Sequence, residues 1–187
     1  MIKIKFNSSS FNAIKYLLLA VLTVSYSSSY ADEAQDQYFD NLSALCGTTY
    51  EGNMTFPIEG QDSFAGKLLV AKFESCTENE IRVPFLVGED ASRTWIFSRI
   101  DDGLQLKHDH RHPDGTPDEV TMYGGIANSS GSKLEQAFEA DPYTAELIPA
   151  AVTNVWNVSL SADQTVLTYH LERNAAPRFT AVLKRIP

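Results

Sequence analysis

Apolar side chains recur at every second residue through most of the chain beyond residue 48. Such alternation is typical of β-strands, whose successive side chains point to opposite faces of a sheet. It is found in residues 48–56, 81–87, 94–98, 104–112, 155–160, 165–173 and 178–184. Shorter runs at 67–76, 120–123 and 134–138 predict further strands, with Gly124-Gly125 as a bend between the last two. The pattern predicts about nine or ten strands, of which two are joined by the Asp101-Asp102-Gly103 hairpin turn.

Two segments depart from this period of two. Residues 32–45 place Tyr38, Leu42 and Leu45 at helical spacing, and Gly47 follows as a stop signal. A second short helix is expected after Asp141-Pro142. Short alternating strands with little helix indicate a single antiparallel up-and-down β-barrel with a short N-terminal helix, or alternatively a β-sandwich. We favour the barrel because closure removes exposed strand edges.

The first 31 residues have the features of a cleavable signal peptide. Lys3, Lys5 and Lys15 stand without acidic neighbours before the apolar run 16–24, and residues 29–31 provide small side chains where signal peptidase requires them. We therefore expect an exported protein, periplasmic or secreted, whose single domain comprises residues 32–187. The apolar run is far shorter than the roughly 20 residues of a membrane-spanning helix, so an integral membrane protein is not expected.

Charge limits the partners of the exported domain. Residues 32–187 contain all 24 acidic side chains but only 12 of the 15 lysines and arginines, a formal charge of −12. Such a surface repels nucleic acid, and binding to DNA or RNA is not expected.

The chain contains two cysteines, Cys46 and Cys76. In an oxidising compartment the expected state is one disulfide, and two free thiols or a metal-binding pair are the alternatives.

Three of the four histidines follow one another at every second position. His108, His110 and His112 would share one face of a strand with neighbouring rings about 6–7 Å apart. A pair of such rings can ligate Zn²⁺ or Cu²⁺, with a carboxylate such as Asp114, Asp118 or Glu119 to complete the shell. The alternative is a polar strand end that runs into the turn-rich segment 113–117. No other segment has the spacing of a catalytic motif, so an enzyme is not favoured and no catalytic residue is assigned.

Aromatic side chains on the same strands could line the interior of a barrel. Tyr50, Trp95 and Phe97 are candidates for a ligand pocket, and Arg99 lies on the Trp95 face, where it could meet an anionic group.

The segment Leu106-Lys107-His108-Asp109-His110-Arg111-His112-Pro113-Asp114-Gly115-Thr116-Pro117-Asp118-Glu119 resembles uncharacterised secreted proteins of Gram-negative bacteria, which implies export and no mechanism. The short helix before Tyr50-Glu51-Gly52, together with a late Arg173, resembles the architecture of the calycin group of ligand-binding barrels. These features favour a non-enzymatic binding module for a small apolar or amphipathic ligand. The alternatives are a metal-binding or metal-dependent hydrolytic protein centred on residues 108–112, and an envelope structural or interaction protein.

Overall fold

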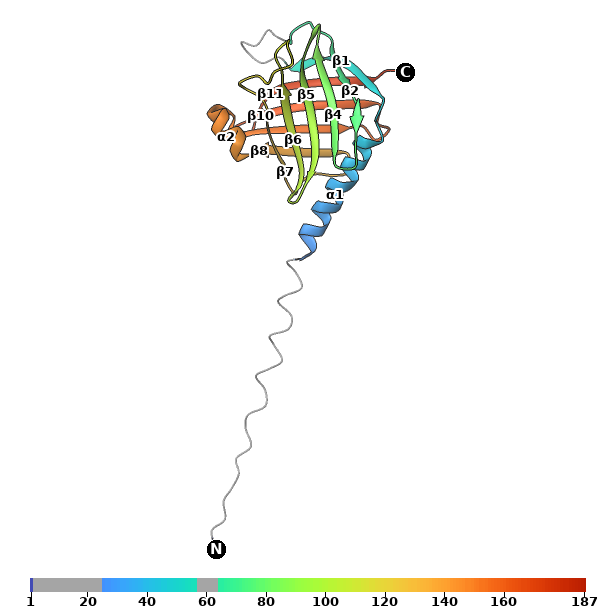
Figure 1. Ribbon diagram of the computed structural model, residues 1–187. Helices are drawn as coiled ribbons and strands as arrows, with labels where there is room; N and C mark the ends of the chain where they lie inside the picture. The colour runs from blue at the N-terminus through green and yellow to red at the C-terminus, as the bar shows by residue number, and fades with distance from the viewer. Residues whose placement is uncertain (2–24, 57–63) are drawn as a thin grey trace.

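The computed structural model describes Met1, residues 25–56 and residues 64–187. Strands dominate this part of the chain, and they form one antiparallel sheet that curls into a barrel (Figure 1). The strands are β1 (Thr49–Phe56), β2 (Leu69–Lys72), β3 (Ser75–Cys76), β4 (Glu80–Val87), β5 (Asp90–Ile100), β6 (Gly103–His110), β7 (Tyr123–Ala127), β8 (Glu135–Ala140), β9 (Asn154–Leu160), β10 (Val166–Arg173) and β11 (Ala176–Arg185). The helices are α1 (Ser25–Ser43), α2 (Pro142–Leu147) and the 3-10 turn η1 (Pro149–Ala151).

The barrel closes through its first strands. From β4 to β11 each strand pairs with the next one along the chain, and β1 then pairs with β11 on one side and with β2 on the other. Strand β4 pairs with both β2 and β3, which follow one another along its edge and share one place in the barrel. Ten positions around the barrel result, which confirms the predicted antiparallel up-and-down barrel.

The predicted alternation decides which side chains fill the interior. In β4 every second residue is buried, and the same rows continue on β6, β9 and β10. The interior rows form one apolar cluster, which includes Leu69, Ile81, Val83, Phe97, Leu106, Phe138, Val158, Leu167, Ala181 and Leu183. Because this cluster occupies the barrel at the level of its central residues, any cavity must lie nearer to one of the two ends.

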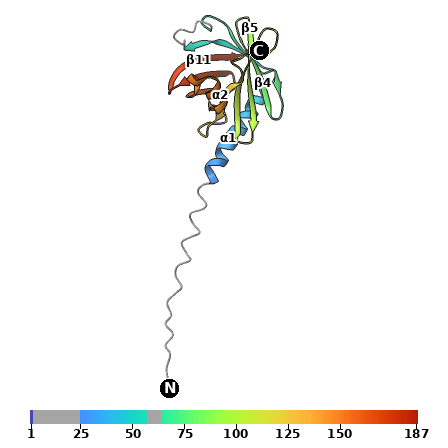
Figure 2. The ribbon, with the colours of Figure 1, turned by 60° about the vertical axis from the view of Figure 1, so that its left-hand side comes forward.

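Helix α1 closes one end of the barrel, as two views of the molecule show (Figures 1 and 2). Tyr38, Phe39 and Leu42 are buried in the common core. The Tyr38 hydroxyl donates to the Val158 carbonyl oxygen at 3.0 Å, and burial raises the pKa of Tyr38 well above its ordinary value, so the hydroxyl keeps its proton. The side-chain carbonyl oxygen of Gln35 accepts from the Leu104 backbone N–H at 3.0 Å. These bonds fix the helix in one orientation.

Removal of the Tyr38 hydroxyl is expected to weaken this closure. Tyr38→Phe should lower the free energy of unfolding by about 1 kcal/mol, because a buried hydrogen bond is lost while the ring remains. Tyr143→Phe is the matched control, since the exposed Tyr143 hydroxyl also donates to a backbone carbonyl oxygen, that of Thr121 at 3.2 Å. Urea denaturation should show a smaller change for the control, and equal losses would contradict a special role of Tyr38.

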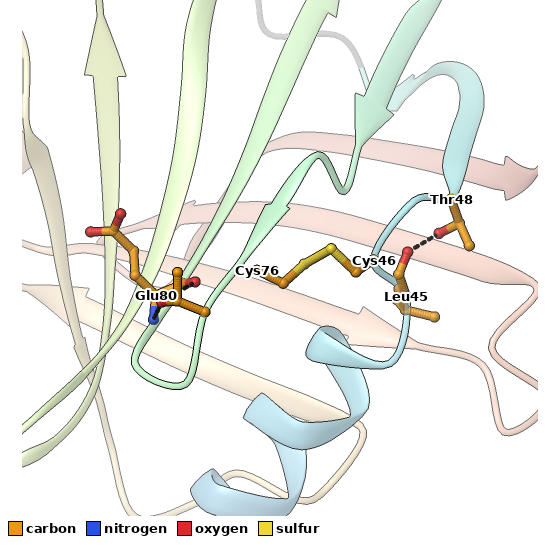
Figure 3. Close-up of a disulfide and its surroundings, with 6 residues drawn as sticks. Leu45, Cys46, Thr48, Cys76 and Glu80 are labelled. Atoms are coloured by element: carbon orange, nitrogen blue, oxygen red, sulfur yellow. Dashed lines mark hydrogen bonds between the residues drawn. A yellow bond between two sulfur atoms is a disulfide. The ribbon is translucent and has the colours of Figure 1, made fainter.

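A disulfide joins the end of α1 to the barrel wall. Cys46 and Cys76 are bonded with their Cα atoms 6.1 Å apart, which confirms the expected pair (Figure 3). Beside it, the Thr48 hydroxyl donates to the Leu45 carbonyl oxygen at 2.6 Å and tightens the turn that leads from α1 into β1. The segment between helix and first strand is therefore held on both sides.

Several element boundaries differ from those predicted. The run 67–76 is divided into β2 and β3, and β7 begins only at Tyr123. Gly124 and Gly125 lie within β7 rather than at a bend, and glycine is required there because a side chain at either position would overlap a carbonyl oxygen of the neighbouring strand. Helix α1 begins at Ser25, earlier than expected. The remainder of the predicted signal peptide, residues 2–24, lies outside the described residues.

Candidate functional site

A cavity of about 350 Å³ lies at the end of the barrel opposite α1. Its walls are the last inward-facing residues of seven strands, and its rim includes Phe64, Asp118, Val120 and the α2–η1 segment. Nine of the 17 lining residues carry aromatic or imidazole rings: Phe64, Phe85, Trp95, His108, His110, Tyr123, Trp156, Tyr169 and Phe179. The others are Arg93, Asp118, Val120, Ile148, Ala151, Asn154, Leu171 and Arg173. The volume is within the range of about 300–1,000 Å³ of small-molecule sites.

The alternation along each strand directs these side chains into the barrel interior, where they line one cavity. In β5 the row of Phe97 and Trp95 ends with Arg93, and in β10 the row of Tyr169 and Leu171 ends with Arg173. Each row thus passes from apolar residues in the middle of the barrel to a cation at the open end. The cavity therefore has an aromatic floor and a polar rim.

The floor on one side is a stack of rings. Phe85 and Tyr169 both lie nearly parallel to Trp95, with ring centroids 4.3 Å and 4.6 Å from the Trp95 centroid. Phe179 meets Tyr169 edge-on at 5.9 Å, and Phe64 meets Phe179 at 5.0 Å. Aromatic pairs at these distances are mutually attractive and rigid. This side of the cavity is therefore a well-packed aromatic wall.

The other side is built around a buried histidine. His108 Nδ1 lies 3.1 Å from the Tyr123 carbonyl oxygen, and Nε2 lies 2.8 Å from the Tyr169 hydroxyl oxygen. Burial lowers the pKa of His108 to about 3, so the ring is neutral at ordinary pH. Since a carbonyl oxygen can only accept, Nδ1 carries the proton and Nε2 accepts from Tyr169. His108 thus links strands β6, β7 and β10.

Tyr123 and His110 continue this polar chain toward the rim. The Tyr123 ring stacks on His108 with centroids 4.8 Å apart, and its hydroxyl oxygen lies 3.0 Å from His110 Nε2. Burial raises the pKa of Tyr123 to about 12, and burial followed by the Arg93 charge lowers the pKa of His110. Both side chains are therefore uncharged at neutral pH, and they offer hydrogen-bonding groups in an otherwise apolar wall.

Two arginines reach the rim, and their partners differ. Arg93 Nη1 lies 2.6 Å from Asp90 Oδ2, and its guanidinium lies 5.4 Å from the Phe64 ring centroid. Burial of Asp90 is outweighed by its hydrogen bonds from Ser92 and Arg93, which lower its pKa to about 2. Arg173 instead donates from Nε to the side-chain oxygen of buried Asn154 at 2.7 Å. None of the ion pairs found in the described part of the chain includes Arg173.

The structure brings one of the four predicted pocket residues, Trp95, to the cavity. Tyr50 and Phe97 are buried in the core beyond it. Arg99 lies at the closed end, where Nη2 is 2.8 Å from Asp40 Oδ1 and the guanidinium covers the Phe39 ring at 4.4 Å. Arg99 also pairs with Asp36 and so attaches α1 to the barrel.

The residues predicted to hold a metal are spread over three environments. Both ring nitrogens of His108 are hydrogen-bonded inside the barrel, and His110 borders the cavity. His112 lies outside the strand with Nε2 3.6 Å from Glu119 Oε2, and Asp114 is exposed in the following turn, where bonds from Thr116 lower its pKa. In the described chain, the ligand atoms that come within 4.8 Å of one another belong to His112 and to two of the predicted carboxylates, Asp118 and Glu119.

Several cavity residues were not predicted from the sequence. Tyr169 and Phe179 lie on strands that the alternation predicts, but nothing in their spacing distinguishes them from ordinary core residues, and Asn154 directly precedes the predicted strand 155–160. The signal that could have found Arg173 is its inward parity: it follows Leu167, Tyr169 and Leu171 at every second position, where an apolar residue is expected.

Because comparisons with known proteins give no match, a function can be assigned only from this geometry. No family model, curated protein or solved structure matches the chain. In the described residues, no helix has the length and apolar character needed to cross a membrane.

Proposed function

We propose that this protein is a non-enzymatic binding module that holds a small apolar or amphipathic ligand in the open end of its barrel. The observation that carries the proposal is the cavity of about 350 Å³ in which nine of 17 lining residues present rings. Concave, mostly apolar sites with a few placed polar groups are the usual form of small-molecule sites. The disulfide and the predicted signal peptide support an exported location.

The chemistry of the polar groups favours binding over catalysis. His108 is committed through both ring nitrogens, and its pKa of about 3 is far from that of a general base that works at neutral pH. Tyr123 and Tyr169 have raised pKa values and remain protonated. These groups are suited to orient a ligand by hydrogen bonds.

The proposal is tested with N-phenyl-1-naphthylamine, a neutral aromatic probe whose fluorescence increases in apolar surroundings. The only two tryptophans, Trp95 and Trp156, both line the cavity, so tryptophan excitation should transfer energy to a bound probe. We expect saturable one-to-one binding. Leu171→Trp should weaken it about tenfold or more, because the larger side chain occupies the open end, a loss equal to about 1.4 kcal/mol.

Leu68→Trp is the matched control, since Leu68 is exposed outside the cavity near the same end. This variant should bind the probe as the unchanged protein does. Thermal melting of both variants checks that the barrel is intact. Absence of saturable binding, or equal binding by the Leu171→Trp variant, would overturn the proposed function.

A further inference from the structure

We infer that the ligand is an aromatic anion, whose rings lie on the Trp95–Tyr169 stack and whose carboxylate or other oxyanion pairs with Arg173. The inference rests on the proposed function, and it adds the chemical class of the ligand. It is based on the position of Arg173, the partners of the other inward-facing arginines, and the shape of the aromatic floor.

By the alternation of side chains along β10, Arg173 is at a position that faces the barrel interior. The preceding inward residues on β10 are Leu167, Tyr169 and Leu171, and Arg173 lines the same cavity as the last two. A guanidinium is always charged, and placing it in a partly desolvated, apolar site carries a cost that an anion can offset. A solvent-exposed position would avoid this cost, so the placement needs a functional explanation.

Comparison with the other two inward-facing arginines shows what is missing at Arg173. Arg99 is paired with Asp36 and Asp40, and Arg93 with Asp90. In the described chain, Arg173 has only the neutral Asn154 side chain as partner, and this bond uses Nε. Its two terminal nitrogens remain for a carboxylate or similar oxyanion, which a guanidinium can bind through two parallel hydrogen bonds.

The surroundings of Arg173 provide a local cationic site on a strongly acidic molecule. Residues 32–187 have a formal charge of −12, so the long-range field repels anions and an anion needs a local cation to bind. Asp118 also borders the cavity, but its Oδ1 accepts from the Val120 backbone N–H at 2.9 Å. Asn154 is buried and holds the Arg173 side chain at the rim. Arg173 is therefore a positioned local charge.

The aromatic floor favours a ligand that contains rings. Trp95 and Tyr169 are nearly parallel, with an interplanar angle of 20°, and the Phe85 plane is within 19° of Trp95. Aromatic ligands can pack against such rings edge-to-face or offset, and they lose little conformational freedom on binding. A flexible aliphatic chain would lose more conformational entropy for the same buried area.

The test compares two probes that share one ring skeleton. N-Phenyl-1-naphthylamine is neutral, and 1-anilinonaphthalene-8-sulfonate carries the same rings with one added sulfonate. The unchanged protein should bind the sulfonate about tenfold tighter than the neutral probe. Arg173→Gln should abolish this preference by weakening sulfonate binding about tenfold, while the affinity for the neutral probe stays within about twofold.

Two further variants keep the test decisive. Arg178→Gln removes an exposed arginine from β11 at the same end of the barrel, and it should leave the preference unchanged. Arg173→Lys retains the charge and should keep part of the preference even if Arg173→Gln folds poorly. Equal affinities for the two probes, or a preference that persists in Arg173→Gln, would overturn the inference that the ligand is an anion. Neither result would contradict the proposed function as a binding module. Failure of both probes to bind would overturn the proposed function itself.

Discussion

Replacement of both cysteines by serine is expected to lower the free energy of unfolding by about 3–4 kcal/mol. The disulfide closes a loop of 30 residues, and a crosslink across such a loop restricts the unfolded chain by roughly this amount in the chain-entropy model. For a domain of this size the melting temperature should fall by roughly 10 °C. The loss should be large because the bond also ties α1, which closes the barrel, to the strand β3 that completes the wall.

Denaturation in urea measures this effect directly. The Cys46→Ser/Cys76→Ser variant should unfold at lower urea concentration than the oxidised protein, and reducing the unchanged protein with dithiothreitol should reproduce the variant's curve. Dithiothreitol added to the variant is the control and should change nothing. A loss below about 0.5 kcal/mol would show that contacts of Tyr38, Phe39 and Leu42 hold α1 without help from the disulfide.

A large dependence of stability on pH is expected from His108. Its pKa is about 3 in the folded protein, because burial disfavours the charged ring, against an ordinary value of 6.5. Between these values the unfolded chain binds a proton that the folded protein does not. The free energy of unfolding therefore falls as pH is lowered from 6.5, by about 2–3 kcal/mol at pH 4.5 and by about 4 kcal/mol at pH 3 from this group alone.

Other groups titrate in the same range, and a difference between proteins isolates His108. Glutamine at position 108 can donate to the Tyr123 carbonyl oxygen and accept from the Tyr169 hydroxyl without titrating. Urea denaturation between pH 7 and pH 4.5 should therefore show a shallower loss of stability in His108→Gln than in the unchanged protein. Carboxylates such as Asp90 and Asp141, whose pKa values are lowered, contribute equally to both.

His110→Gln serves as a second control, because His110 also has a lowered pKa but lies at the rim. It should change the pH dependence less than His108→Gln does. Nitrogen-15 NMR of the unchanged protein should in addition show His108 neutral, with its proton on Nδ1, throughout this range. Parallel pH profiles for the unchanged protein and His108→Gln, or a protonated His108 ring at pH 5, would contradict the buried neutral histidine.

The period of two was enough to predict the rows of side chains that fill the barrel. It depends only on neighbours along the chain, so Ile81, Val83 and Phe85 could be assigned to one face without a structure. Segment 120–123 was misjudged because Gly124 and Gly125, which look like a break, instead allow close approach of neighbouring strands within β7. How closely two strands approach one another depends on their pairing in the folded barrel, and the residues next to Gly124 and Gly125 along the chain do not indicate it.

Spacing along the sequence predicted only part of the environment of the histidine segment, residues 108–112. The sequence correctly placed His108 and His110 on the face of Leu104 and Leu106. It could not show that His108 lies deep enough to meet Tyr169 from β10, or that His112 lies beyond the strand. The distance of each side chain from the open end depends on where α1 closes the barrel. Contacts between residues far apart in the sequence fix the position of α1.

The sequence alone predicted an antiparallel sheet, favoured its closure as a single barrel and favoured one disulfide, because alternation, turn residues and two cysteines act locally or by simple pairing; the structure confirms the barrel and the disulfide. The tertiary structure decided which end is closed and which is open, and therefore that Arg99 binds α1 while Arg93 and Arg173 face a cavity. The physical reason is that strands β5 and β10 are far apart in the sequence, and their side chains face the same interior only once the barrel has closed. Their register and the position of α1 arise from contacts between residues that are 60 or more positions apart, such as those joining His108 to Tyr169 and Tyr38 to Val158.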